Sequence, residues 1–333
     1  MSDEKKPIDP LELYSNPARL EELMAGQSSS RTIDVAEFSA FLKSKVIGQD
    51  QVCTDVPRQI NQRMALEQRG KPLGVFLFAG PPGTGKTYLA KKIAEYLERK
   101  LLHLDMTNFA SAHAASQLFG SPKGYVGSNT YGRLTGGLRD IPNALVLLDE
   151  IEKADPDVMK RFLTAWNDGF ITEVSDGKAI STTKAVFVLT SNAAVDVLDD
   201  LSEQYADDSD ELRRSTTNAL REAGFAPEVL SRIDRIFVFK RLKGRDIARV
   251  AALEIASMIE SYGLELERGG IAIEFLFSIM QRQEKLGSTA TSRDLTRFIE
   301  DDIADQLIEI KQSGRKTVRL EYDGKKVRAE GSQ

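Results

Sequence analysis

A short glycine-rich segment carries the residue types that could do chemistry on phosphate groups. It has the pattern G-x-x-x-x-G-K-[ST], and its eight residues are Gly80, Pro81, Pro82, Gly83, Thr84, Gly85, Lys86 and Thr87. Glycines allow successive backbone N–H groups to curl around phosphate oxygens, and a following helix adds its unpaired amides. Lys86 adds a positive charge for the β- and γ-phosphates, and the hydroxyl of Thr87 suits Mg²⁺. The pattern therefore predicts a phosphate-binding loop.

Two carboxylates follow an apolar run that we expect to form a strand of the same sheet. Asp149 and Glu150 come directly after residues 144–148, and ligands of parallel sheets bind at the carboxyl ends of the strands. We expect Asp149 to hold the Mg²⁺ shell and Glu150 to polarise an attacking water, as hydrolysis of a nucleoside triphosphate requires. Without the loop, the same pair is equally compatible with a strand end that faces solvent.

A further polar side chain, Asn192, ends the run of strand-forming residues that begins at 185. If this strand lies between the strand before the loop and the strand before Asp149, the amide reaches the γ-phosphate and the water from the side. We interpret Asn192 as the second residue that positions the water. An asparagine that caps a turn is the competing interpretation.

The elements that must position these residues alternate between short β-branched runs and helical segments. This alternation predicts a five-stranded parallel sheet with helices on both faces, an α/β fold, over residues 36–240. The five strands are expected at 75–78, 101–104, 145–148, 185–189 and 236–239. Residues 1–35 have the composition of an N-terminal extension. Residues 241–333 predict a small, mostly helical domain that ends in a hairpin at 317–322 and 327–329, with residues 330–333 frayed.

Composition excludes several other classes of function. The 333 residues include 45 Lys and Arg against 50 Asp and Glu, a net charge of −5, which argues against broad binding of duplex DNA. One cysteine and two histidines cannot supply a four-ligand Cys/His zinc site. The charged start has no apolar region behind it, and the chain contains no apolar window long enough to span a membrane. We therefore expect a cytoplasmic protein without a membrane partner.

Motifs along the chain occur in the order found in one family, which the sequence resembles: the AAA+ ATPases, and within them the Clp-type unfoldases and disaggregases. The likeness is strongest to the second ATPase module of the ClpB and ClpA type and extends from about residue 45 to 322. Besides the two nucleotide motifs, the segments that carry it are 46–49, 124–127, 147–157, 231–234 and 292–297. The resemblance implies ATP and Mg²⁺ as cofactors, and a AAA+ large domain followed by a lid domain.

The same resemblance implies roles for residues away from the loop. Val46 and Ile47 would flank the adenine, and Arg232 would be the arginine finger that reaches the γ-phosphate bound by a neighbouring subunit. Arg293 corresponds to the second sensor of the lid domain, although the chain has Thr-Ser-Arg where the family usually has Gly-Ala-Arg. Arg235 and Arg297 lie close in sequence and compete for these two assignments. A surface ion pair is the alternative for each arginine.

Tyr125 and Val126, between two glycines, match the loop that lines the central pore in similar proteins. A large aromatic residue on a hinged loop can grip a polypeptide without regard to its sequence. A surface turn whose tyrosine packs on its own domain is the alternative. Residues 173–178 are a weaker candidate for a second pore element, because their glycine and charges suit a flexible loop.

The leading hypothesis from the sequence is an ATP-hydrolysing motor that forms a ring, a hexamer, and threads or remodels an unfolded or assembled protein client. The chain is too short for the recruiting and middle domains of larger members, and no Ile-Gly-Phe or Ile-Gly-Leu tripeptide precedes Arg232. We therefore expect no Clp peptidase partner. One alternative is a nucleic-acid motor or loader with a basic stripe at Lys91, Lys92, Arg99 and Lys100. The other is a nucleotide-switched adaptor for one dedicated protein.

Overall fold

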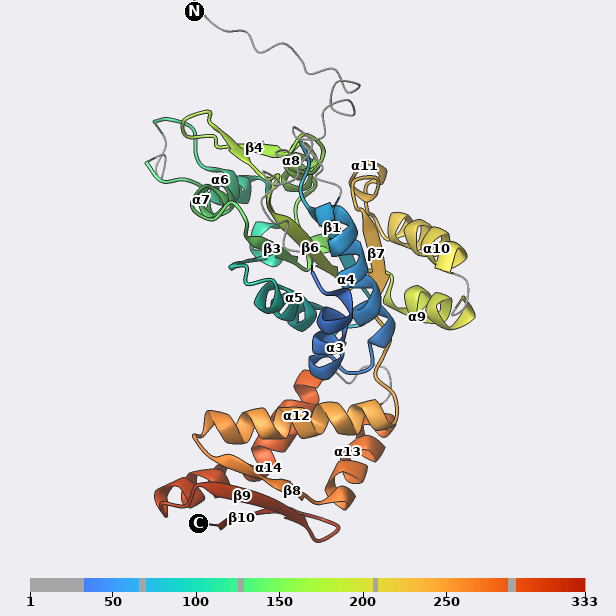
Figure 1. The fold of residues 1–333 in the computed structure, drawn as a ribbon, viewed down its shortest axis with the longest axis vertical. Helices are drawn as coiled ribbons and strands as arrows, with labels where there is room; N and C mark the ends of the chain where they lie inside the picture. The colour runs from blue at the N-terminus through green and yellow to red at the C-terminus, as the bar shows by residue number, and fades with distance from the viewer. Residues whose placement is uncertain (1–32, 66–69, 125–128, 206–208, 287–291, 333) are drawn as a thin grey trace, which may run out of the picture.

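The computed structural model describes residues 33–65, 70–124, 129–205, 209–286 and 292–332 (Figure 1). The N-terminal extension therefore lies almost wholly outside the described residues, as do Tyr125 and Val126. We use the name large domain for residues 36–240 and small domain for residues 241–333, the boundaries predicted from the sequence. In Figure 1 the small domain lies at the end of the large domain opposite α8 and β4.

The large domain is built on a five-stranded sheet whose strand order is β2-β3-β6-β1-β7. The strands are β1 (Gly74–Ala79), β2 (Leu101–Asp105), β3 (Leu145–Asp149), β6 (Val186–Ser191) and β7 (Arg235–Val238). All neighbouring pairs in it are parallel. The predicted parallel sheet is confirmed, and β6 lies between β1 and β3, as the interpretation of Asn192 required.

Both faces of the sheet are covered, which explains the uninterrupted apolar runs. Val75 and Leu77 pack into the core beneath one layer of helices, while Phe76 and Phe78 point into the opposite core. Successive side chains of a strand point to opposite faces, so every position of β1 must be apolar or small. One layer consists of α3 (Val35–Lys45), α4 (Asp50–Ala65) and α5 (Lys86–Tyr96).

The other face carries the remaining helices of the large domain. They are α6 (Ala115–Phe119), α7 (Arg133–Asp140), α8 (Pro156–Asn167), α9 (Val195–Gln204), α10 (Ser209–Glu222) and α11 (Pro227–Leu230). Short 3-10 helices occur at Met106–Phe109, Ala112–Ala114 and Ile151–Lys153. Helix α8 shows why such an element begins where it does: the Asp155 side chain accepts the N–H of Asp157, and Pro156 occupies the first turn.

The large domain also contains a small antiparallel hairpin that the sequence pattern does not predict. It consists of β4 (Phe170–Thr172) and β5 (Ala179–Ser181), and its connection is the segment 173–178. The sequence suggests a flexible loop here; the structure has a closed turn in which Glu173 is fully buried and the backbone is bonded across the turn. A role of this segment as a second pore element stays a prediction. Strands of three residues give too short a pattern to recognise.

The small domain packs three helices against a three-stranded sheet. The helices are α12 (Arg245–Ser261), α13 (Ile273–Leu286) and α14 (Ser292–Gln312), and the strand order is β10-β9-β8. The hairpin of β9 (Thr317–Tyr322) and β10 (Val327–Ser332) confirms the expected one.

Two details of the small domain differ from the expectation. The C-terminal residues do not all fray, since β10 runs to Ser332, which pairs with Thr317. Strand β8 (Glu265–Ile271) was not predicted, and its pairing with β9 is irregular between Leu266 and Ile271. Two consecutive glycines in that interval obscure the strand pattern.

No helix in the described part of the chain combines the length and apolar character needed to cross a membrane. The expected cytoplasmic location stays a prediction of the sequence.

Two isoleucines of α14 allow a matched test of the small-domain core. Ile303 is fully buried and Ile308 is 41% exposed. We expect Ile303→Ala to lower the free energy of unfolding by about 2–5 kcal/mol, because a buried side chain is replaced by a cavity. Ile308→Ala should change it by no more than about 0.5 kcal/mol. Urea denaturation of both variants measures the difference, and equal losses would contradict the assigned packing.

Candidate active site

The glycine-rich segment forms a closed loop between β1 and α5. Gly80, Gly83 and Gly85 have positive φ angles of 142°, 74° and 93°, which glycine adopts without strain. A Cβ atom on Gly80 would lie 2.5 Å from the carbonyl oxygen of Phe239, so this position also lacks room for a side chain. The hydroxyl of Thr84 donates to the carbonyl of Pro81 over 2.8 Å and closes the turn.

Lys86 is almost fully buried at the start of α5. Its Nζ donates to the carbonyl oxygens of Gly80 and Pro81, both at 2.7 Å, and to Oδ1 of Asn192 at 2.8 Å. Burial lowers the pKa of Lys86 to about 8, although the nearby carboxylates of Glu152, Asp149 and Glu150 act in the opposite direction. A buried ammonium held by loop carbonyls is a cation that an anionic ligand would stabilise.

Asp149 lies at the end of β3 and is bonded on both of its oxygens. Oδ1 accepts the hydroxyl of Thr87 at 2.9 Å and also that of Thr190, while Oδ2 lies 3.0 Å from Nε2 of His103. Thr87, in the first turn of α5, and Asp149, at the end of β3, are thus brought together as the sequence predicted. Their oxygen atoms are the hard ligands that Mg²⁺ prefers, so the residues fit this ion.

Glu150 leaves the strand in an unusual conformation. Its φ angle is 56°, in the left-handed region that non-glycine residues rarely adopt. The Oγ1 of Thr190 accepts its N–H at 3.0 Å, and the Nδ2 of Asn192 donates to its Oε1 at 3.3 Å. Asn192 therefore contacts both Glu150 and Lys86, and its own N–H donates to the carboxylate of Glu152 at 3.0 Å. This turn directs the Glu150 side chain toward Asn192.

These side chains surround one cavity of about 280 Å³. Its lining comprises Pro82, Gly83, Gly85, Lys86, Thr87, Tyr88, Asp149, Glu150, Thr190 and Asn192. The cavity thus has backbone amides and a cation on one wall and carboxylates on the other, the arrangement that phosphoryl transfer to water needs.

A second cavity, of about 390 Å³, lies on the other side of the same loop. Val46 and Ile47 line it together with residues 83–85 of the loop, and Val250 and Leu253 of α12 close it from the small domain. It is a mainly apolar slot shared by the two domains. Val46 and Ile47 therefore lie where an adenine ring could rest while its phosphates occupy the loop.

The arginines expected at the site do not line either of these two cavities in the described part of the chain. Arg232 is exposed, follows α11 and lines neither of these cavities. Arg235 lies in β7 and borders a separate cavity of about 250 Å³. Arg293 belongs to the first turn of α14, and its side chain is outside the described residues, as is that of Arg297.

Three residues of the site were not assigned from the sequence: Thr190, His103 and Gln49. Thr190 and His103 both bond to Asp149, and only the register of β2, β3 and β6 brings them there. Each is a polar residue near the carboxyl end of a strand, and this position could have indicated a place beside Asp149. Gln49 belongs to a motif that was recognised without a role for this side chain.

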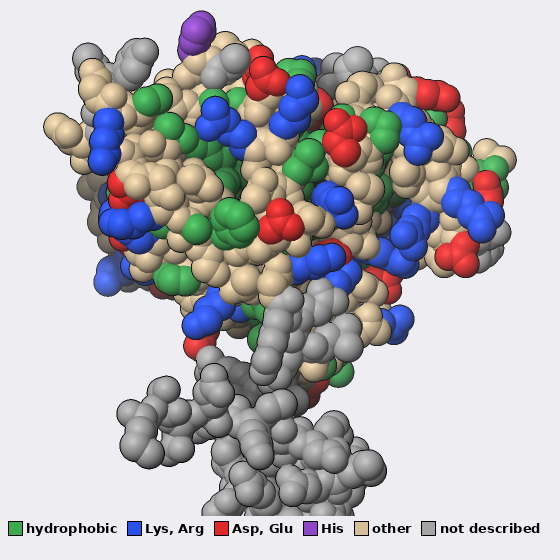
Figure 2. Space-filling model, turned by 90° about the horizontal axis from the view of Figure 1, so that it is seen from above, with side chains coloured by type: hydrophobic (Ala, Val, Ile, Leu, Met, Phe, Trp, Pro, Cys, Tyr) green, Lys and Arg blue, Asp and Glu red, His purple; other side chains and the backbone are tan. Residues whose placement is uncertain are grey.

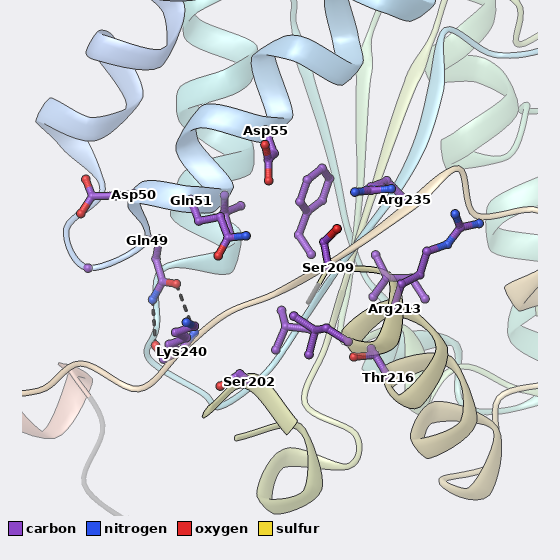
Figure 3. A pocket seen from close by; sticks show the side chains of 16 residues that line it. Gln49, Asp50, Gln51, Asp55, Ser202, Ser209, Arg213, Thr216, Arg235 and Lys240 are labelled. Atoms are coloured by element: carbon purple, nitrogen blue, oxygen red, sulfur yellow. Dashed lines mark hydrogen bonds between the residues drawn. The ribbon is translucent and has the colours of Figure 1, made fainter. Parts of the chain in front are cut away.

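Gln49 joins the loop to the connection between the domains. It is 3% exposed, its Nε2 donates to the carbonyl of Lys240 at 2.8 Å, and its Oε1 accepts the N–H of Lys240 at 3.1 Å. The same Nε2 lies 3.5 Å from the carbonyl of Thr84 in the loop. Figure 3 shows the paired bonds to Lys240 beside the cavity that Arg235 and Thr216 also border. The side chain of Gln49 therefore links the loop directly to the connection between the domains.

The lowered pKa of Lys86 predicts a proton uptake when phosphates bind. Near pH 9 most of the protein carries a neutral Lys86, and the negative charge of a bound nucleotide favours the ammonium form. Binding should therefore take up a proton and weaken as pH rises through about 8. Near pH 7 the uptake should be small. Titration calorimetry of ADP in two buffers with different ionisation enthalpies measures it.

Lys86→Arg provides the control for this measurement, because a guanidinium keeps its charge throughout the range. We expect the variant to show no proton uptake at either pH. An uptake equal to that of the unmodified chain would mean that a group other than Lys86 titrates.

Comparison with known proteins places this site in a family. Residues 71–236 match the sequence model of the AAA domain (Cdc48 subfamily). The chain is 34% identical over 290 residues to the chaperone protein ClpB of Rhodopirellula baltica, covering 85% of this chain and 32% of the relative. It is 33% identical over 303 residues to the ATP-dependent Clp protease ATP-binding subunit ClpE of Bacillus subtilis, covering 88% and 42%.

A plant relative matches over nearly the whole chain. The chloroplastic chaperone protein ClpC2 of Arabidopsis thaliana is 31% identical over 331 residues, 93% of this chain and 34% of the relative. The chain spans about a third of the length of most of these curated relatives. With the phosphate loop, the two carboxylates and the strand order in place, the chain belongs to the Clp-type AAA+ ATPases.

Proposed function

We propose that this chain is an ATP-hydrolysing motor that assembles into a ring, a hexamer, and remodels a protein client by threading it through a central pore. The observation that carries the proposal is the hydrogen-bonded connection from Lys86 through Asn192 to Glu150. It links the group that would bind the γ-phosphate to the group that would activate water. Fold alone would not support an activity.

The chemistry assigned to each residue follows from its position. Lys86 and the loop amides would bind the β- and γ-phosphates of ATP, and Glu150 would accept a hydrogen bond from the attacking water and orient it. Asn192 would hold the Glu150 carboxylate and approach the water from the side. Mg²⁺, held by Thr87 and Asp149, would neutralise charge on the phosphates.

Domain motion would follow from a nucleotide shared between the domains. The apolar slot has walls from Val46 and Ile47 in the large domain and from α12 in the small domain. Gln49 adds a direct link from the loop to the interdomain connection at Lys240. We infer that occupancy of the slot changes the angle between the domains, with Arg293 as a second sensor.

The ring is proposed because, among the arginine side chains that the structure describes, none lines either of the two cavities beside the loop. Arg232 is exposed and apart from the cavities, so as a finger it would complete the site of a neighbouring copy. Such a contact joins two different surfaces and can close into a ring.

The relatives named chaperones support a protein client, which Tyr125 and Val126 would contact. We also propose that the motor acts without a Clp peptidase.

The nucleic-acid alternative receives less support from the described side chains. Arg99, in the proposed basic stripe, donates to the carbonyls of Asn143 and Lys184 at 2.8 and 2.7 Å, and Lys92 pairs with Glu95. These two cations are already engaged within the chain. On the face drawn in Figure 2, Lys and Arg side chains are interspersed with Asp and Glu. A phosphate backbone would require a more continuous positive surface.

Replacing Glu150 tests the assigned site. We expect Glu150→Gln to keep ATP binding and oligomerisation while lowering the rate of hydrolysis by about 100-fold or more, because an amide cannot accept the proton of water. Steady-state phosphate release and nucleotide binding measure the two effects. Glu260→Gln, an exposed change on α12, is the matched control and should hydrolyse ATP normally. Hydrolysis retained by the Glu150 variant would reject the assignment.

Replacing Tyr125 tests the threading proposal separately. We expect Tyr125→Ala to keep nearly normal basal hydrolysis but to lose the remodelling of a fluorescently labelled unfolded casein, since the apolar grip is removed. Tyr125→Phe keeps the aromatic surface and should retain remodelling. If the alanine variant remodels casein like the unmodified chain, Tyr125 is not the gripping residue.

A further inference from the structure

Glu173 is a buried carboxylate outside the nucleotide site, and the proposed reaction does not use it. Its side chain is fully buried after β4. Oε2 accepts the N–H of Gly132 at 3.1 Å and the hydroxyl of Thr135, and Oε1 accepts the N–H and hydroxyl of Ser175 at 3.0 and 2.6 Å. Burial by itself would raise the pKa of Glu173, but these hydrogen bonds together hold it below its ordinary value. The group is therefore a buried anion held by neutral donors.

These bonds join the β4–β5 hairpin to the end of the segment 120–132. Gly132 and Thr135 form the start of α7, the point at which that segment ends. Residues 124–127 of the segment carry the Gly-Tyr-Val-Gly motif, of which 125–127 are outside the described residues. The carboxylate therefore holds one end of the segment that carries Tyr125.

The same carboxylate contacts the other end of the segment. A Cβ atom on Gly120 would lie 1.6 Å from Oε1 of Glu173, so only glycine fits there. The N–H of Val174 donates to the carbonyl of Phe119 at 2.8 Å. A Cβ on Gly132 would lie 2.2 Å from the carbonyl oxygen of Leu118, which means that the two ends also contact each other.

A second contact reinforces this junction at the turn of the hairpin. The hydroxyl of Tyr131 donates to Oδ2 of Asp176 at 2.5 Å, and the guanidinium of Arg139 lies 4.3 Å from the centre of the Tyr131 ring. The turn is closed by bonds from the N–H of Glu173 to the carbonyl of Lys178 and from the N–H of Gly177 to the carbonyl of Glu173. Hydrogen bonds thus close the turn of the hairpin and join it to Tyr131.

The hairpin is also joined to the nucleotide site through one rigid element. Glu150 is followed by the 3-10 helix Ile151–Lys153 and then by α8, which runs to Asn167, three residues before β4 begins. Helix α8 is 12 residues long and packs Phe162 and Trp166 into the core. A continuous path of packed elements therefore runs from Glu150 along α8 to the hairpin and, through Glu173, to the segment 120–132.

We propose that Glu173 is a positioning residue that fixes the β4–β5 hairpin to both ends of the segment 120–132, so that the two move as one unit and transmit force to Tyr125. This inference rests on the proposed function for its purpose. A role in stability alone would not require this carboxylate, because replacing a buried acceptor and its donors by apolar groups of the same shape can be nearly neutral. Four neutral donors on one carboxylate instead favour a fixed geometry between two segments.

The test compares Glu173→Gln with Asp168→Asn, an exposed acid-to-amide change between α8 and β4. The glutamine keeps the size of the side chain, but on either side its amide N–H groups face a backbone N–H, that of Gly132 or that of Ser175. At least one hydrogen bond of the junction is therefore lost. We expect near-normal basal ATP hydrolysis, and a stimulation of hydrolysis by unfolded casein that falls several-fold. The control should behave like the unmodified chain.

Hydrogen exchange gives a second readout that does not depend on the client. In Glu173→Gln the amides of the junction, in residues 119–124, 129–135 and 173–178, should exchange about tenfold faster, with little change in the rest of the chain. Thr135→Val removes one donor at almost constant volume and should give a smaller effect of the same kind. This milder variant also tests the proposal if the glutamine variant unfolds.

The possible outcomes separate the two proposals. If casein does not stimulate the unmodified chain, the proposed function fails, while the exchange measurement still tests the junction. Normal casein stimulation in Glu173→Gln, or faster exchange spread evenly over the chain, would overturn the positioning role.

Discussion

The burial of one cation, Lys86, is the constraint on which the rest of the structure depends. A buried ammonium is tolerated only where oxygen atoms replace its lost hydration, and here two carbonyls of the loop and the amide of Asn192 do so. The carbonyls come from the closed loop after β1, and the amide comes from the end of β6. The loop and the neighbouring strand are therefore fixed by the same charge, and a bound phosphate would take over part of this role.

Parallel strands explain how residues distant in sequence meet around that charge. Their carboxyl ends lie at one edge of the sheet, which brings Asp149, Asn192 and the loop together although more than 100 residues separate Lys86 from Asn192. The order β3-β6-β1 places Asn192 between the carboxylates and the lysine. The sheet thus sets the order in which the side chains contact a ligand, and Gln49 extends the connection to the small domain.

Much of this arrangement could be predicted from local patterns, and the remainder depends on register. The loop, both carboxylates and the place of Asn192 each follow from a motif at a strand end. His103 could not be assigned, because its role depends on the pairing of β2 with β3, which brings it to Asp149. The same holds for Glu173, which resembles a loop residue in sequence and is buried only because the hairpin folds against residues 119–135. Short strands such as β4 and the interrupted β8 lack a pattern of sufficient length.

The carboxylates of Glu150, Glu173 and Asp149 are all oriented by neutral hydrogen-bond donors. Glu150 is held by the amide of Asn192, Glu173 by backbone and hydroxyl donors, and Asp149 by the hydroxyls of Thr87 and Thr190. Neutral donors fix the orientation of a carboxylate without cancelling its charge, whereas a direct ion pair with a cation would do both. At Glu150 the retained charge is what activation of water needs, and the left-handed backbone, stabilised by Thr190, supplies the direction. At Glu173 the retained charge lets one side chain bond two segments at once, because both of its oxygens keep their full capacity to accept.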